Sequence, residues 1–269
     1  MLTFAPDMST ILFQSPVFGP VHSRRLGVSL GVNLLPGDCK VCDFDCIYCE
    51  CGYNKDGRGG KGHQNLPSRQ EVVSALRQKL EEMRREGVLP DVITFAGNGE
   101  PTLSPVFPEV IGDTIALRDE FCPKAKIAVL SNATMAHKPE VFDALMRVDD
   151  NILKLDTVDN AYIRLLDRPV SPSYDVKRVV ETLKKFNGHV IVQTMFLKGK
   201  MEGKDVDNTS EEFVKPWLEA VKDIAPMQVM IYTIDRETPD HDLEKASPET
   251  LNAIRDRVKA LGIDCTASY

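Results

Sequence analysis

Short apolar segments and helical patterns alternate along this chain so regularly that few folds are compatible with it. Six segments are short and rich in Val and Ile, which is typical of parallel strands covered on both faces. They are residues 28–35, 92–96, 127–130, 152–155, 190–197 and 229–234. Right-handed crossovers join such strands into an incomplete barrel. The sequence therefore predicts an α/β fold, a partial TIM-like (β/α)6 barrel of parallel strands.

The segments between the strands carry helix signals. Ser68 and Glu71 form a capping box, and apolar residues then recur on one face until Gly87. Two further helices are predicted to begin at Ser104-Pro105 and at Ser247-Pro248, because Pro is favoured in the first turn of a helix. The remaining helices are predicted at residues 139–148, 160–166, 174–186 and 210–224.

The chain is predicted to form one domain with a short N-terminal cap. Residues 1–27 contain Pro6, Pro16 and Pro20 and show little periodicity, so we expect an irregular or short-stranded cap there. No internal segment is rich enough in Pro, Gly or Ser to separate two domains. The barrel is expected to occupy residues 28–269, and a chain of 269 residues suits one α/β barrel.

Five of the seven cysteines lie within residues 39–51, directly after the first predicted strand. Cys42, Cys46 and Cys49 have the spacing C-x3-C-x2-C. Three thiolates on so short a loop can ligate three irons of a 4Fe–4S cluster and leave the fourth iron open. A structural zinc site and a run of buried thiols are the alternatives. Structural zinc usually takes two separated ligand pairs, however, and no second C-x2-C or H-x3-H pair follows.

Polar residues recur where the predicted strands end, which is the edge where α/β folds place their chemistry. They include Asn98, Gly99, Glu100, Ser131, Asn132, Lys154, Asp156, Gln193, Thr194, Tyr232 and Asp235. Each could be a helix cap or a turn residue. Together with the cysteine loop they predict the wall of a pocket.

Two of these features suit a nucleotide-like ligand. Gly97 and Gly99 allow the backbone to approach a ligand closely and to point carbonyl groups at an ammonium group, although a tight turn would need glycines as well. Asp156 can accept hydrogen bonds from sugar hydroxyls.

The charge balance argues against a protein whose main task is to bind nucleic acid. Lys and Arg total 33 against 40 for Asp and Glu, which gives a net charge of -7. A local basic patch remains compatible with this balance. The glycine-rich segment 54–64 is either a solvated connector or a lid over an anionic substrate. Its basic residues, with two from the N-terminal region, are Lys55, Arg58, Lys61, Arg24 and Arg25.

The expected location is the cytoplasm, with no membrane association. The first twenty residues lack the basic region of a secretory signal, and no apolar run is long enough to span a membrane. An odd number of cysteines with one tight cluster fits a reducing compartment and metal ligation better than a disulfide framework.

The cysteine motif, with Tyr48 before its last cysteine, and the turn from Gly97 to Pro101 resemble the radical S-adenosylmethionine (radical SAM) superfamily. This resemblance covers nearly the whole chain, and the usual Gly-Gly-Glu reads Asn98-Gly99-Glu100 here. Other motifs resemble a branch of Fe–S oxidoreductases related to the tRNA wybutosine-synthesis radical enzymes. They are Ser-Arg-Arg-Leu-Gly at 23–27, Gly-Asn-Gly-Glu-Pro-Thr-Leu at 97–103, Ser-Asn-Ala-Thr at 131–134, Leu-Asp-Arg-Pro at 166–169 and Tyr-Thr-Ile-Asp-Arg at 232–236.

The resemblance implies an enzyme in which Cys42, Cys46 and Cys49 ligate a 4Fe–4S cluster whose fourth iron binds S-adenosylmethionine (SAM). One electron, from a donor such as flavodoxin or ferredoxin, would cleave SAM to methionine and a 5′-deoxyadenosyl radical, which abstracts hydrogen from the substrate. The resemblance also assigns cofactor-binding residues. The methionine amino group would lie against Gly97, Asn98, Gly99 and Glu100, the ribose or carboxylate against Asn132, Asp156 and Gln193, and the adenine against Tyr48 and Tyr232.

The substrate is not identified by these motifs. A small molecule is the first expectation, tRNA the second and a glycyl-radical partner protein the third. Only Cys265 lies near the end of the chain, so no auxiliary cluster is expected there. A zinc-stabilised interaction module is the non-enzymatic alternative. Cys39 and Cys51 receive no role.

Overall fold

The structure is a computed structural model that describes residues 11–23, 27–54, 65–236, 238–239 and 241–269. In this part of the chain, eight strands form one sheet in the order β1-β2-β3-β4-β5-β6-β9-β11. The strands are β1 (Val17–Ser23), β2 (Gly27–Val32), β3 (Val92–Phe95), β4 (Lys126–Ser131), β5 (Asp150–Lys154), β6 (Ile191–Met195), β9 (Gln228–Tyr232) and β11 (Cys265–Ser268). β1 is antiparallel to β2, and all later neighbours are parallel.

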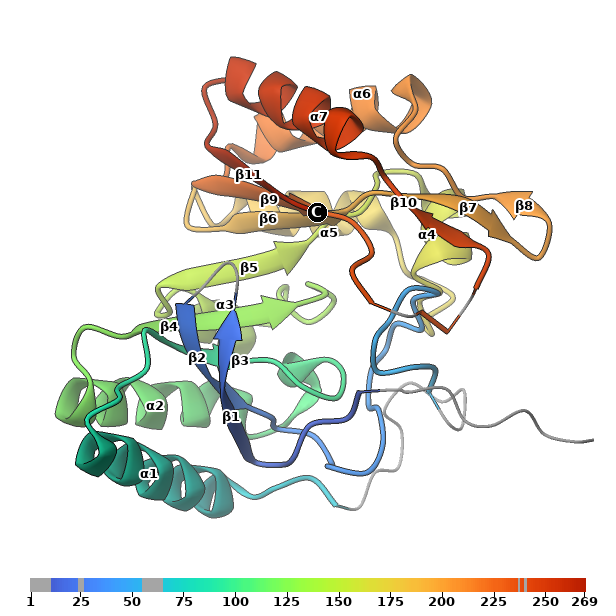
Figure 1. The fold of residues 1–269 in the computed structure, drawn as a ribbon. Coiled ribbons are helices and arrows are strands. Elements are labelled where there is room, and N and C mark those ends of the chain that lie inside the picture. Colours follow the sequence, from blue (N-terminus) through green and yellow to red (C-terminus); the bar gives the residue numbers. More distant parts are fainter. Residues whose placement is uncertain (1–10, 24–26, 55–64, 237, 240) are drawn as a thin grey trace, which may run out of the picture.

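Helices lie outside the curved sheet, so the molecule has the expected form of an open, partial βα barrel (Figure 1). They are α1 (Arg69–Glu86), η1 (Pro101–Leu103), α2 (Phe107–Phe121), α3 (Pro139–Leu145), α4 (Asn160–Leu166), α5 (Val176–Lys184), α6 (Glu211–Ile224) and α7 (Pro248–Ala260). The predicted capping box of α1 is present, and Gly87 ends that helix in the left-handed conformation with φ of 73°.

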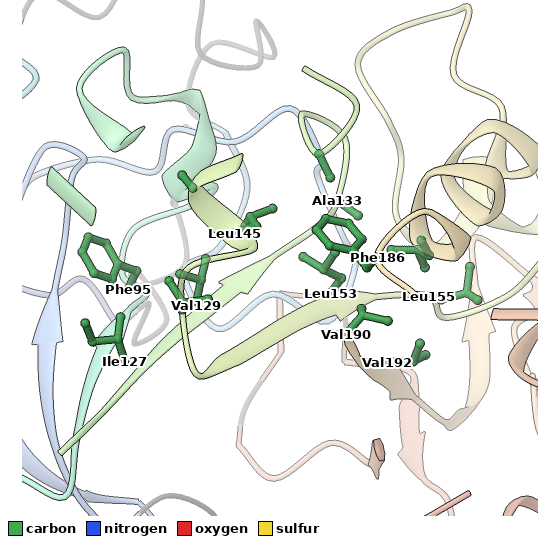
Figure 2. Packing of buried hydrophobic residues seen from close by; sticks show 14 of the residues in the cluster. Phe95, Ile127, Val129, Ala133, Leu145, Leu153, Leu155, Phe186, Val190 and Val192 are labelled. Carbon is green, nitrogen blue, oxygen red and sulfur yellow. The ribbon is translucent and has the colours of Figure 1, made fainter. Parts of the chain in front are cut away.

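The main hydrophobic core lies between the sheet and these helices. Alternate strand residues point outward into it, because successive side chains of a strand face opposite sides. Figure 2 shows this layer around β4 and β5, with helix and loop residues on its other side. The labelled members are Phe95, Ile127, Val129, Ala133, Leu145, Leu153, Leu155, Phe186, Val190 and Val192.

The inner face of the sheet is different. Within the first three residues of β3, β4, β5, β6 and β9 a small buried cluster fills it, and its members are Val92, Ala128, Ile152, Ile191 and Met230. Beside this cluster the hydroxyls of Ser29 and Thr94 lie 2.8 Å apart in a hydrogen bond. The inner face is therefore packed at one end of the strands only.

The structure adds strands that the sequence patterns did not predict. β11 extends the parallel sheet beyond the six predicted strands. The N-terminal cap, which was expected to be irregular or short-stranded, contains β1, and this strand pairs with β2. A second sheet contains β7 (Leu197–Met201), β8 (Lys204–Asp205) and β10 (Leu243–Lys245) in the order β10-β7-β8. The single strand predicted over 190–197 is interrupted at Phe196 and continues as β7.

One predicted helix start is wrong. We expected a helix to begin at Ser104-Pro105, but α2 begins at Phe107 and Val106 is its N-cap. The preceding residues Pro101–Leu103 form a separate 3₁₀ turn whose N-cap is Glu100. The side chain of Glu100, which caps this turn, also accepts hydrogen bonds from the end of β4.

Candidate active site

The cysteine loop lies at the carboxyl end of β2, on the side toward which the arrows of β4 and β5 point (Figure 1). Backbone hydrogen bonds join it to the turn after β3. Val41 donates to the carbonyl of Asn98 at 2.8 Å, and Glu100 donates to the carbonyl of Val41 at 3.0 Å. A side chain on Gly99 would overlap the Val41 carbonyl, because an added Cβ would lie 1.9 Å from its oxygen. Glycine at this position is thus what allows the loop and the turn to meet.

Cys42 and Cys46 are both buried in this loop. Hydrogen-bond donors surround the sulfur of Cys42, whereas an acceptor lies beside that of Cys46. The sulfur of Cys42 accepts a hydrogen bond from the backbone N–H of Phe44 at 3.4 Å, and the amide of Asn132 lies 3.7 Å from it. The thiol of Cys46 instead donates to the Asp167 carboxylate at 3.2 Å. Burial raises the pKa of both thiols, and the charge of Asp167 raises that of Cys46 further.

Cys49 differs from the other two cysteines. A hydrogen bond from the Cys51 thiol lowers the pKa of Cys49 to about 5, despite burial, and the nearby ammonium group of Lys40 contributes in the same direction. Both neighbours therefore favour the thiolate form of Cys49. The Cys51 sulfur also lies 3.4 Å from the carbonyl oxygen of Gly97, so this residue connects the cysteine loop to the turn after β3.

Beside the cysteine loop, three buried polar side chains and the partly buried Lys154 form one network. The hydroxyl of Tyr48 donates to Asp156, lies 3.1 Å from Asp167 and accepts a hydrogen bond from the ammonium group of Lys154. Lys154 lies 3.1 Å from Asp156 and 4.0 Å from Asp167. Burial and the charge of Asp156 raise the pKa of Asp167 to about 7. The network thus holds two carboxylates close to one ammonium group.

The turn after β3 is fixed by the side chains of Asn98 and Glu100. The amide group of Asn98 is fully buried and bonds the backbone of Phe13 and Pro36 at 2.7–2.9 Å. The sequence prediction assigned the cofactor contact to the turn as a whole, with its glycines allowing the backbone to approach the ligand. In the structure the polar atoms of both side chains bond other parts of the protein.

Glu100 connects this turn to the end of β4. Its carboxylate accepts hydrogen bonds from the backbone of Thr102 and Asn132 and from the hydroxyl of Ser131, at 2.6–3.0 Å. Burial raises the pKa of Glu100 to about 7, and the charge of Asp43 adds to this effect. The side chain of Asn132 bonds Asp43 at 2.6 Å, which brings the end of β4 to the cysteine loop.

A cavity of about 500 Å³ opens on the inner face of the sheet next to this network. Tyr48, Gln193 and Tyr232 line it, so three of the predicted cofactor-binding residues share this space. Much of the remaining lining is apolar or aromatic, and it includes Phe13, Phe18, Leu130, Met195, Met230 and Tyr269. Glu50 and Arg236 also line the cavity and form an ion pair of 2.7 Å.

Comparison with known proteins identifies the family. Residues 39–213, which include the cysteine loop and all strands from β3 to β8, match the Radical SAM superfamily. The chain belongs to the radical SAM superfamily. Members of this family use a 4Fe–4S cluster and SAM, so the zinc-stabilised module is not the correct alternative for the cysteine loop.

Individual relatives agree with this assignment. The chain is 31% identical over 224 residues to a UPF0026 protein of Helicobacter pylori, covering 82% of this chain and 66% of that protein. It is 27% identical over 260 residues to a UPF0026 protein of Methanocaldococcus jannaschii, covering 91% and 74%. The chain thus spans slightly less than two thirds of the length of the Helicobacter relative.

Solved structures share the radical SAM fold. A radical SAM methyltransferase from Sphaerobacter thermophilus superposes with a TM-score of 0.64 at 17% identity, over 90% of this chain and 66% of that chain. A structure of TYW1 with a lysine-pyruvate adduct bound gives a TM-score of 0.58 at 12% identity, over 86% and 73%. These similarities confirm the radical SAM barrel as the fold of this chain.

The donor set of the cysteine loop fits the radical SAM cluster. Cys42, Cys46 and Cys49 lie within eight residues of one another, and the backbone N–H of Cys49 donates to the carbonyl of Cys46 at 3.1 Å, so the three thiols belong to one tight loop. Within the described ranges, no three His, Cys, Asp or Glu side chains are arranged to hold a single metal ion. A cubane does not need such convergence, because each thiolate binds a different iron.

Two residues of the polar network beside the cysteine loop were missing from the predicted set. Lys154 was placed at the rim but given no role, and Asp167 was quoted only as part of a motif. Asp167 follows α4, and its contact with Cys46 joins residues 121 positions apart in sequence. Hydrophobic periodicity cannot reveal a single buried carboxylate such as Asp167. The Leu-Asp-Arg-Pro motif was the sequence signal that could have pointed to it.

Some predicted features lie outside the described residues. They are the basic residues Lys55, Arg58, Lys61, Arg24 and Arg25. In the part of the chain that is described, no helix has both the length and the apolar character that a membrane span requires.

Proposed function

We propose that Cys42, Cys46 and Cys49 ligate the 4Fe–4S cluster and that SAM binds between this loop and the cavity on the inner face of the sheet. A cluster bound there supplies one electron, taken from a flavodoxin or ferredoxin, that cleaves SAM to methionine and a 5′-deoxyadenosyl radical, which takes a hydrogen atom from the substrate. The observation that carries the proposal is the bridge between Val41 and Gly99, since it joins the three-cysteine loop to the glycine turn.

The chain's own residues have distinct tasks in this proposal. The backbone of the turn from Gly97 to Glu100 would hold the amino group of SAM, while the side chains of Asn98 and Glu100 keep the turn rigid. Asp156 and Lys154 lie beside the cavity and not in its lining, and they are the proposed acceptor and donor for hydroxyl groups of the ribose. Their mutual ion pair keeps both side chains oriented before the cofactor arrives.

Asn132, Gln193, Tyr48 and Tyr232 complete the proposed cofactor site. Asn132 lies beside Cys42, where its amide would meet the carboxylate of SAM next to the cluster. Tyr48, Gln193 and Tyr232 line the cavity, which makes them the proposed contacts of the nucleoside. The aromatic rings offer flat apolar surfaces for the adenine.

We propose that the substrate is a small molecule. Its support is the cavity of about 500 Å³, which lies within the range of small-molecule sites and would hold the substrate next to the nucleoside of SAM, between apolar and polar side chains. The proposed location is the cytoplasm. All seven cysteines belong to the described residues and none forms a disulfide, which supports a reducing compartment.

The test begins with anaerobic reconstitution using iron and sulfide. The protein is expected to bind about four irons and, after reduction with dithionite, to release methionine and 5′-deoxyadenosine in equal amounts. A protein that binds iron and sulfide but leaves SAM intact would overturn the proposed chemistry.

The substrate class is then tested with extracts of cells grown in heavy water. The extract is separated into small molecules, tRNA and protein, and deuterium in 5′-deoxyadenosine is measured by mass spectrometry after each fraction is added. Deuterium transfer from the small-molecule fraction is expected. Transfer from tRNA or from protein instead would overturn the small-molecule proposal and favour the other two substrate classes.

A further inference from the structure

Lys40 is a buried lysine near the start of the cysteine loop. Its side chain is only 2% exposed, although lysine is rarely fully buried without partners. Its ammonium group donates to the carbonyl of Gly52 at 2.9 Å and to the carboxylate of Asp45 at 3.5 Å. These two contacts close the loop around the lysine from its far end.

The ammonium group of Lys40 also acts on the sulfur atoms. It hydrogen-bonds the side chain of Cys49, and Gly52, whose carbonyl accepts from Lys40, donates its own N–H to the carbonyl of Cys49 at 2.9 Å. Cys42 follows Lys40 by two residues on the same loop, and the Lys40 charge also acts on Cys42 and Cys46. Asp45 is its carboxylate partner among the described residues, and this contact is long for an ion pair. One positive charge is therefore buried among three thiols and is only partly balanced by carboxylate.

We propose that Lys40 is a positioning residue whose fixed positive charge stabilises the reduced cluster and raises its reduction potential. This inference rests on the proposed function, in which the three cysteines bind the cluster. Three thiolates make a 4Fe–4S centre anionic, and adding an electron makes it more so. A buried cation within reach of all three sulfurs therefore favours the reduced form, because interactions between charges are strong where water is excluded. Net charge and hydrogen bonds to the sulfurs are among the factors that set such potentials.

The alternative is that Lys40 only holds the loop together through Gly52 and Asp45. Substitutions of Lys40 distinguish the two roles. Gln at this position can still donate hydrogen bonds but carries no charge, whereas Arg keeps the charge. A purely structural role predicts the same potential for all variants that assemble a cluster.

The experiment compares the reconstituted wild-type protein with Lys40→Gln and Lys40→Arg. Lys184→Gln is the matched control, because Lys184 is an exposed lysine on α5 paired with Glu181. The potential of each cluster is measured anaerobically by redox titration, with the electron paramagnetic resonance signal of the reduced cluster as readout. Iron and sulfide content and the circular dichroism spectrum are recorded for every variant.

Lys40→Gln is expected to lower the equilibrium constant for one-electron reduction at least tenfold, which corresponds to about 59 mV. The reduction potential of Lys40→Arg should lie much closer to that of the wild type, and the potential of Lys184→Gln should equal the wild-type value. Cluster assembly in Lys40→Arg but not in Lys40→Gln would also support the proposal, since it shows that the charge is needed.

Two results would overturn the inference alone. One is an unchanged potential in Lys40→Gln with a fully assembled cluster. The other is equal loss of the cluster in Lys40→Gln and Lys40→Arg, which would make the lysine a packing residue. A wild-type protein that binds no cluster at all would instead overturn the proposed function, so the two failures are distinguishable.

Discussion

The outer layer of the barrel and the carboxyl end of its sheet are both buried, but they are built from different chemistry. Between the sheet and the helices the side chains are apolar and interlock, as around Leu153 and Phe186 (Figure 2). At the carboxyl end, buried charged and polar groups such as Asp156, Asp167 and Glu100 are held by hydrogen bonds. Burial of the apolar layer stabilises the fold, whereas burial of the polar groups at the carboxyl end costs free energy unless each group finds a hydrogen-bond partner.

Removal of a cysteine ligand should show the largest effect at the carboxyl end. Cys46→Ala is expected to abolish the release of 5′-deoxyadenosine, since one of three proposed iron ligands is lost, while the fold is kept. Cys122→Ala is the matched control, because Cys122 is a buried thiol at the end of α2, away from the loop. Product formation is measured by mass spectrometry after reduction. Equal activity of the two variants would contradict the ligand assignment.

In the outer layer, a substitution is expected to change the stability of the fold. Leu153 is fully buried, so Leu153→Ala should lower the free energy of unfolding by roughly 2–5 kcal/mol. Gln193→Ala, on the neighbouring strand but facing the cavity, should cost much less because no packed layer lies over it. Urea unfolding of the protein without cofactors measures both. A larger loss in Gln193→Ala would show that the inner face also carries stability.

This contrast explains which parts could be predicted from the sequence. The outer layer leaves a periodic signal, so α4 was predicted at residues 160–166 as observed and β3 within one residue. β11 was missed because residues 265–268, with Thr266 and Ser268, are too short and polar to stand out. The β7–β10 pair joins residues more than forty positions apart and has no local pattern.

At the carboxyl end the sequence predicted which residues gather but not what each side chain does. The motifs placed Glu100 and Asn98 in the correct turn. Their hydrogen bonds to Asn132 and Phe13 depend on long-range contacts that only the folded chain creates. The roles of Lys154 and Asp167 depend on the same kind of contact with Tyr48.

The titration of Glu100 tests the cost of burying charge at this end. Burial and the charge of Asp43 raise its folded-state pKa to about 7, above the value of an unfolded chain. Between these two pKa values the folded state binds more protons, so stability falls as the pH rises through that window, by at most roughly 3–4 kcal/mol. Glu100→Gln should flatten this slope in urea unfolding measured from acidic to neutral pH. An unchanged slope would assign the effect to other groups.

The two ends of β5 allow the smallest and most direct comparison. Asp156 follows this strand and is buried against Lys154, whereas Asp150 begins it and pairs with the exposed Lys126. Asp156→Asn keeps an oxygen that can accept from the backbone of Met195 but loses the charge that would bind ribose hydroxyls. We expect SAM to bind the reconstituted variant about tenfold more weakly, close to the loss of one charged hydrogen bond. Equilibrium dialysis measures the affinity, and the iron content should not change.

Asp150→Asn should bind SAM as the wild type does, because a carboxylate at the amino end of a parallel strand is remote from the cofactor. Equal weakening in both variants would mean that general loosening of β5, and not contact with the cofactor, is responsible.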